Sequence, residues 1–129
     1  MEARVVLSSE EILRGLKHYR RIAKQDLLLA GETENPDAFR LHAEARRNVY
    51  SHLSDLANNL SPSEVVAEAL EEYRALPFVT GSTDLAHTEI KGRENALENF
   101  FLMIGLEPKL RREVRSQRKA MHDGEAASL

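Results

Sequence analysis

The sequence predicts an all-α fold, a single-domain bundle of about five antiparallel helices. The composition is that of a globular chain, because 42% of the 129 residues are hydrophobic and 30% are charged, with only six glycines and four prolines. This length suits one ordinary domain. Apolar residues recur at spacings of three and four between signals that start helices. The helices are expected at about 8–30, 36–59, 62–76, 83–104 and 108–121, so the bundle domain covers 1–121 and residues 122–129 form a frayed tail.

The first helix, 8–30, has the clearest start. Ser8 and Glu11 have the spacing of a capping box, in which each side chain accepts a hydrogen bond from the other residue's backbone N–H. Apolar residues then gather on one helix face: Ile12, Leu16, Tyr19, Ala23, Leu27 and Ala30. Basic residues gather on another face: Arg14, Lys17, Arg21 and Lys24. The helix is expected to end near Gly31.

The second and third helices each open with a capping residue followed by proline. Asn35 precedes Pro36, and Ser61 precedes Pro62, with Glu64 completing a second capping box. The second helix directs an apolar stripe inward: Phe39, Val49, Leu53, Leu56 and Leu60. Pro77 ends the third helix, and the apolar residues of the connection 78–81 are expected to fold back onto the core.

The fourth helix, 83–104, runs toward Gly105. Gly92 in its middle costs about 1 kcal/mol relative to alanine, so a bend or a division into two shorter helices is an alternative. The fifth helix opens at Pro108, and residues 107–119 carry six basic and two acidic side chains, a net charge of +4. Such a segment can form an RNA-facing patch with the first helix, dock on the acidic third helix, or present a solvated face with internal ion pairs.

The two halves of the chain contain similar sequence motifs. Leu7-Ser8-x-x-Glu11 is matched by Leu60-Ser61-x-x-Glu64, and each motif is followed by a helix and then by a second helix containing His-x-Glu. One hypothesis is a duplicated helical hairpin, with a third copy beginning in the fifth helix. The alternative is that capping boxes and amphipathic stripes converge on the same residues.

Several classes of chemistry are excluded or disfavoured by composition. The chain has no cysteine, which removes disulfides, thiolate nucleophiles and sulfur-ligated metal sites. Paired Glu-x-x-His motifs do not occur, so neither a metal nor another cofactor is expected. The longest apolar run has five residues against the ~20 that cross a bilayer, and the start of the sequence has no signal-type core. The expectation is therefore a cytoplasmic protein without a membrane partner.

The strongest catalytic candidate is Arg47-Asn48-x-x-x-His52. This spacing resembles the Arg, polar residue, spacer, His signature of HEPN-type helical domains. The resemblance implies a metal-independent endoribonuclease or a non-catalytic RNA-binding relative, in which Arg47 holds a phosphate and His52 is the general acid or base. That activity requires both side chains to open into one electropositive cleft, although five residues along a continuous helix place them about 140° apart.

A second resemblance involves residues 60–73. Their sequence is similar to the second helix of ribbon-helix-helix DNA-binding proteins, which implies a short upstream strand that enters the major groove in a dimer. The upstream region here predicts a helix instead. The third helix is also acidic, and negative charge repels phosphate.

The expected function is that of a non-enzymatic protein–protein interaction or adaptor module, with self-association as a homodimer as one form of it. Leu27-Leu28-Leu29 carries this expectation, because three consecutive residues of a helix cannot all face one core. The alternatives are RNA binding or cleavage through Arg47 and His52 and, third, ribbon-helix-helix-like DNA binding.

Overall fold

The computed structural model describes residues 5–79 and 85–119, and over these residues the protein is all-α. Five α-helices and one short 3-10 helix make up this part of the chain. Their bounds are α1 Ser9–Leu29, η1 Ala30–Glu32, α2 Pro36–Asn59, α3 Pro62–Ala75, α4 Leu85–Met103 and α5 Pro108–Ser116. The predicted all-α fold is therefore confirmed, whereas the predicted frayed tail 122–129 lies outside the described residues.

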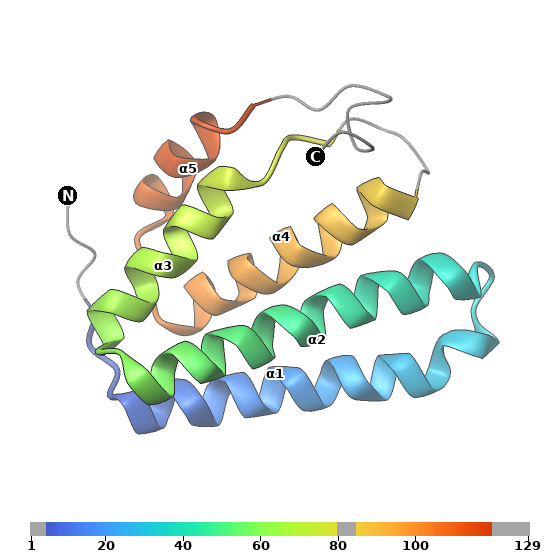
Figure 1. Ribbon diagram of the computed structural model, residues 1–129, viewed down its shortest axis with the longest axis horizontal. Helices are drawn as coiled ribbons and strands as arrows, with labels where there is room; N and C mark the ends of the chain where they lie inside the picture. The colour runs from blue at the N-terminus through green and yellow to red at the C-terminus, as the bar shows by residue number, and fades with distance from the viewer. Residues whose placement is uncertain (1–4, 80–84, 120–129) are drawn as a thin grey trace.

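The helix α2 is the centre of the arrangement. Figure 1 shows α1 and α2 side by side and antiparallel, with α4 on the other side of α2 and running in the same direction as α2. The shorter helices α3 and α5 pack on each other and lean across one end of this layer. The chain thus alternates in direction from α1 to α4, while the packed neighbours α2 and α4 run parallel.

The predicted helix starts are present as hydrogen bonds. The Ser8 hydroxyl accepts from the Glu11 N–H at 3.2 Å, and the Glu11 carboxylate accepts from the Ser8 N–H at 3.1 Å. Ser61 and Glu64 repeat this geometry at the start of α3. The Asn35 side chain accepts from the backbone of the first turn of α2. These local contacts satisfy N–H groups that have no partner inside the helix.

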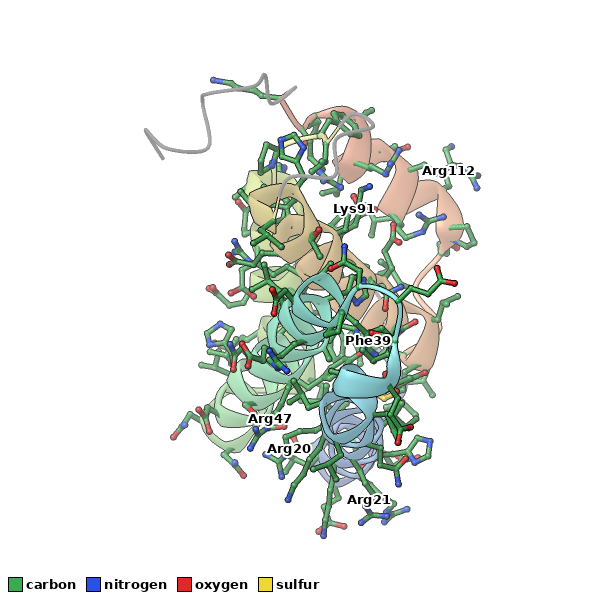
Figure 2. All side chains as sticks on the ribbon, turned by 90° about the vertical axis from the view of Figure 1, so that its right-hand side faces the viewer. Arg20, Arg21, Phe39, Arg47, Lys91 and Arg112 are labelled. Atoms are coloured by element: carbon green, nitrogen blue, oxygen red, sulfur yellow. The ribbon has the colours of Figure 1, made fainter. Side chains whose placement is uncertain are left out.

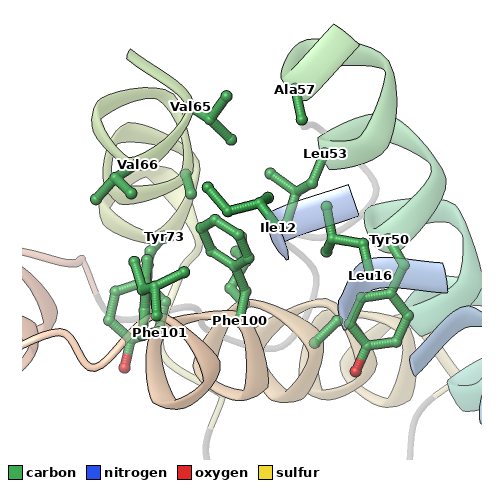
Figure 3. Close-up of a cluster of buried hydrophobic side chains, with 14 of the residues drawn as sticks. Ile12, Leu16, Tyr50, Leu53, Ala57, Val65, Val66, Tyr73, Phe100 and Phe101 are labelled. Atoms are coloured by element: carbon green, nitrogen blue, oxygen red, sulfur yellow. The ribbon is translucent and has the colours of Figure 1, made fainter. Parts of the chain in front are cut away.

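The core forms where four helices meet (Figure 3). Its largest members come from each of them: Ile12 and Leu16 from α1, Tyr50 and Leu53 from α2, Val65, Val66 and Tyr73 from α3, and Phe100 and Phe101 from α4. The Tyr73 ring meets the Phe101 ring edge-on at 5.3 Å between centroids. Aromatic packing of this kind adds directional contacts to the burial of apolar area.

Gly92 has a packing role instead of marking a break in α4. The helix is continuous through it, and a Cβ at this position would lie 2.7 Å from the His42 carbonyl oxygen and 2.9 Å from the Ala45 Cβ. The alternative of two shorter helices is therefore wrong. Gly105, with φ of +71°, ends α4 in a Schellman turn, in which the Leu106 N–H donates to the Phe101 carbonyl at 2.9 Å.

Two predictions about helix arrangement are corrected by the structure. The duplicated hairpin is wrong, because α1 and α2 pack along their length whereas α3 and α4 diverge and find their main neighbours in α5 and α2. The fifth helix ends at Ser116 and not at 121. It ends early because the next residues pair with the segment after α3: Lys119 accepts from the Phe78 N–H at 2.7 Å, and Arg118 donates to the Leu76 carbonyl.

Candidate functional site

Arg47 lies in an open groove between α1 and α2. The groove has a volume of about 340 Å³ and is lined by Lys17, Arg20, Arg21, Lys24, Arg47 and Ser51. Figure 2 shows Arg20 and Arg21 from α1 and Arg47 from α2 on one side of the molecule. The lining therefore contains five cations and one hydroxyl, and no carboxylate.

Helix geometry explains why these side chains converge. The α1 residues fall at spacings of three and four, which places them on one face of a helix with 3.6 residues per turn. Arg47 and Ser51 are four residues apart in α2, so they too share a face. The antiparallel packing of α1 on α2 then sets the two rows against each other.

Within residues 5–79 and 85–119, no carboxylate neutralises the cations of the groove. Among the described residues, none of the five forms an ion pair. The neighbouring Arg46 behaves differently, because its guanidinium lies 2.8 Å from the Asp26 carboxylate of α1. The nearest acidic residue before Arg47 in α2 is Glu44, which is exposed and lies outside the lining. Closely spaced like charges repel, so this groove favours a bound anion.

His52 does not share the groove with Arg47. Its Nε2 lies 2.8 Å from the Glu72 carboxylate of α3. It lines a separate depression of about 230 Å³ bounded by Ala45, Asn48, Val49, His52, Glu72, Glu89 and Arg93. Because α2 is a continuous α-helix, five residues of separation turn the two side chains toward different neighbours. The Arg47 and His52 pairing that the HEPN resemblance requires is not formed.

The second depression is lined by both acidic and basic side chains. Glu72 and Glu89 oppose His52 and Arg93 in its lining. Over the residues the structure describes, no three histidine or acidic side chains are arranged to hold a metal ion. One oxygen of Glu72 is buried without a hydrogen-bond partner, although the side chain as a whole is about one-third exposed.

A polar network joins α2 to α1 at Arg46, the residue before Arg47. Arg46 donates from Nε to the Nδ1 of His42 at 3.1 Å while it pairs with Asp26. Burial lowers the pKa of His42 below its ordinary value of 6.5, and the positive charge of Arg46 lowers it further. Neutral His42 is therefore the form that accepts this hydrogen bond.

The basic residues near α5 are committed to the fold. The Arg118 side chain is fully buried, lies 2.6 Å from the Glu94 carboxylate and donates to the carbonyls of Leu76 and Pro77. Its guanidinium also stacks over the rings of Tyr73 and Phe78, and Arg115 stacks over Phe78. Arg111 pairs with Glu98. The segment therefore forms internal ion pairs, but the buried Arg118 differs from the solvated face that one alternative predicted. Helix α5 also packs on the acidic α3, as the docking alternative predicted.

The joint basic patch of the first and fifth helices does not form. α5 lies on α3 at the far side of the molecule from α1, as the positions of Arg112 and Arg21 in Figure 2 show. The ribbon-helix-helix resemblance also fails, because the residues upstream of α3 form helix α2 and not a strand.

Comparison of the chain with protein-family models, with curated proteins and with solved structures found no match. In the described residues, no helix is both long enough and apolar enough to cross a membrane. The functional inference therefore depends on the groove itself.

The sequence indicated the basic face of the first helix, but it did not indicate Arg20 as part of that face or Arg47 as lying opposite it. If the first two helices are paired as an antiparallel hairpin, the register of that pairing sets Arg47 against the basic face of the first helix.

Proposed function

We propose that the protein is a non-enzymatic interaction module that holds a polyanionic partner in the groove between α1 and α2. The observation that carries this proposal is the set of five cations without a carboxylate partner among the described residues. An anion placed there removes the mutual repulsion of these side chains. The guanidinium groups of Arg20, Arg21 and Arg47 offer planar, bidentate donor pairs that suit phosphate and carboxylate oxygens.

The chemistry of the lining supports binding and not catalysis. The lining contains no histidine and no carboxylate, the side chains that most often act as general acids or bases. His52 has the suitable chemistry, but it pairs with Glu72 in the other depression. A binding role therefore agrees better with the geometry than ribonuclease activity does.

The test uses inorganic polyphosphate as a simple polyanion and Arg112→Ala as the matched control. Arg112 is an exposed arginine on α5, away from the groove, so its removal changes the net charge as much as Arg47→Ala does. We expect Arg47→Ala to weaken polyphosphate binding about 5- to 10-fold by titration calorimetry, and Arg112→Ala to leave it unchanged. Equal loss in both variants, or no binding by the wild type at about 50 mM salt, would contradict the proposal.

A second proposal is self-association through the end of α1. Leu28 is 78% exposed and Leu29 is 52% exposed, so the chain's own core does not cover these two residues of the Leu27-Leu28-Leu29 run. Exposed leucines side by side favour contact with another apolar surface. Light scattering should then give a mass of twice 14.6 kDa for the wild type and 14.6 kDa for Leu28→Glu. A monomeric wild type at high concentration would contradict this second proposal.

A further inference from the structure

The lining of the groove favours a nucleic acid over a protein as the polyanion. Protein–protein interfaces are enriched in aromatic residues, methionine and arginine, and their cores are depleted of charged residues. The groove supplies arginine alone of these, and five of its six lining residues are charged. Interfaces with nucleic acids are more polar and far more positively charged.

The groove also favours a duplex over a single strand. Proteins that bind single strands stack the bases on aromatic rings, and the lining contains no ring. The nearest tyrosines are Tyr19 and Tyr50, which stack on each other at 5.4 Å between α1 and α2. Tyr50 is buried and Tyr19 is half-buried, so this pair holds the helices together. In a duplex the bases are already stacked and need no ring from the protein.

The dimensions fit a phosphodiester backbone. Lys17 and Lys24 are seven residues apart, which is about 10 Å along the helix axis. One strand of a duplex places a phosphate every ~3.4 Å along its axis, so the α1 row covers roughly three phosphates. Arg47 adds a cation from the other wall of the groove, and Ser51 adds a hydroxyl that can donate to a phosphate oxygen.

Resting on the proposed function, we propose that the groove binds the phosphodiester backbone of a double-helical nucleic acid without regard to base sequence. Up to five cation–phosphate contacts form, from the four basic residues of α1 and from Arg47. RNA and DNA duplexes share this chemistry. The backbone supplies the affinity, because a row of cations and a hydroxyl are the donors that most often contact phosphate oxygens.

The experiment measures fluorescence anisotropy with labelled duplexes of about 20 base pairs, in RNA and DNA forms and in two unrelated sequences, together with the single strands. The salt concentration is varied from about 50 to about 200 mM. About three phosphates along α1 and one at Arg47 predict a slope near −3.6 for log K against log salt, which is roughly a 150-fold loss of affinity over this range. Both sequences should bind alike, and duplexes should bind more tightly than single strands.

Variants separate charge from structure. Arg47→Ala should reduce the slope by about 1, whereas Arg47→Lys retains the charge and should retain the slope. Arg112→Ala should match the wild type. Thermal unfolding of each variant confirms that it is folded. A slope unchanged by Arg47→Ala would overturn the inference.

Two further probes distinguish this inference from the proposed function. If polyphosphate binds in the groove but duplexes do not, the nucleic-acid inference is wrong and the polyanion proposal stands. Tighter binding of polyglutamate than of either duplex would indicate an acidic protein partner, and would likewise overturn the inference alone. Binding of no polyanion at about 50 mM salt would overturn both. A strong preference for the RNA or the DNA duplex would identify which source of the shared backbone is used.

Discussion

Helices α1 and α5 are both basic, but their cations have opposite environments. From Arg14 to Lys24 the first helix has five arginines and lysines and no acidic residue. Four of the five line an open groove without ion pairs among the described residues. In and just after α5, Arg111 and Arg118 pair with glutamates of α4. The buried Arg118 guanidinium also stacks over two aromatic rings.

The difference shows that a count of basic residues does not identify a binding surface. The segment 107–119 carries a net charge of +4, yet carboxylates and aromatic rings from α3, α4 and their connection neutralise or cover much of it. Among the described residues, no carboxylate or aromatic ring lines the groove that holds four of the α1 cations. Charge that lacks an internal partner is the better indication of an external one.

Among the variants considered, Arg118→Ala should have the largest effect on stability. Removal of the guanidinium leaves the Glu94 carboxylate and the carbonyls of Leu76 and Pro77 without their donor. The free energy of unfolding in urea should fall by about 3 to 5 kcal/mol, as when one partner of a buried ion pair is removed. The exposed Arg112→Ala should change it by less than about 0.5 kcal/mol. Similar effects of the two variants would show that Arg118 does not hold the fold.

Gly92→Ala tests whether the groove is independent of α4. The added Cβ would meet the His42 carbonyl at 2.7 Å, so α4 must move away from α2, at a cost of about 1 to 3 kcal/mol of stability. Gly31→Ala is the control, since nothing lies within 4 Å of its added Cβ. The groove contains no residue of α4, so polyphosphate binding by the folded variant should equal that of the wild type. Weakened binding would mean that α4 shapes the groove.

The pH dependence of stability probes the network beside the groove. His42 faces Arg46 of its own helix, Asp26 of α1 and Lys91 of α4. Since its pKa is lowered in the folded state, the unfolded chain binds more protons below pH 6.5. The contribution of His42 to the free energy of unfolding should therefore be fully present above about pH 6.5, and it should decline as the pH falls toward the lowered pKa. His42→Gln should flatten this part of the urea-unfolding profile, and an unchanged profile would assign it to other groups.

The smallest expected effect on stability is that of Arg47→Ala. Its side chain is exposed and has no ion pair among the described residues, so the free energy of unfolding should change by less than about 0.5 kcal/mol. Urea unfolding measures this directly. This small effect should contrast with that of Arg118→Ala. A large loss of unfolding free energy in Arg47→Ala would mean that the groove cations also support the fold.

Sequence signals alone determined the local features of this protein. The caps at Ser8, Asn35 and Ser61 are made by residues within three or four positions of each other, so the helix starts could be read directly. The same locality revealed the basic stripe of α1, because residues three and four apart share a helix face.

Tertiary structure decided everything that depends on distant neighbours. Arg47 faces the basic row of α1, while His52, five residues later, faces Glu72 of α3, so one predicted site became two unrelated surfaces. Helix α5 ends at Ser116 because Arg118 donates hydrogen bonds to the carbonyls of Leu76 and Pro77, some forty residues earlier in the chain. The physical reason is that charge is neutralised, and backbone groups are paired, by atoms near in space, and sequence spacing specifies those only within a single helix.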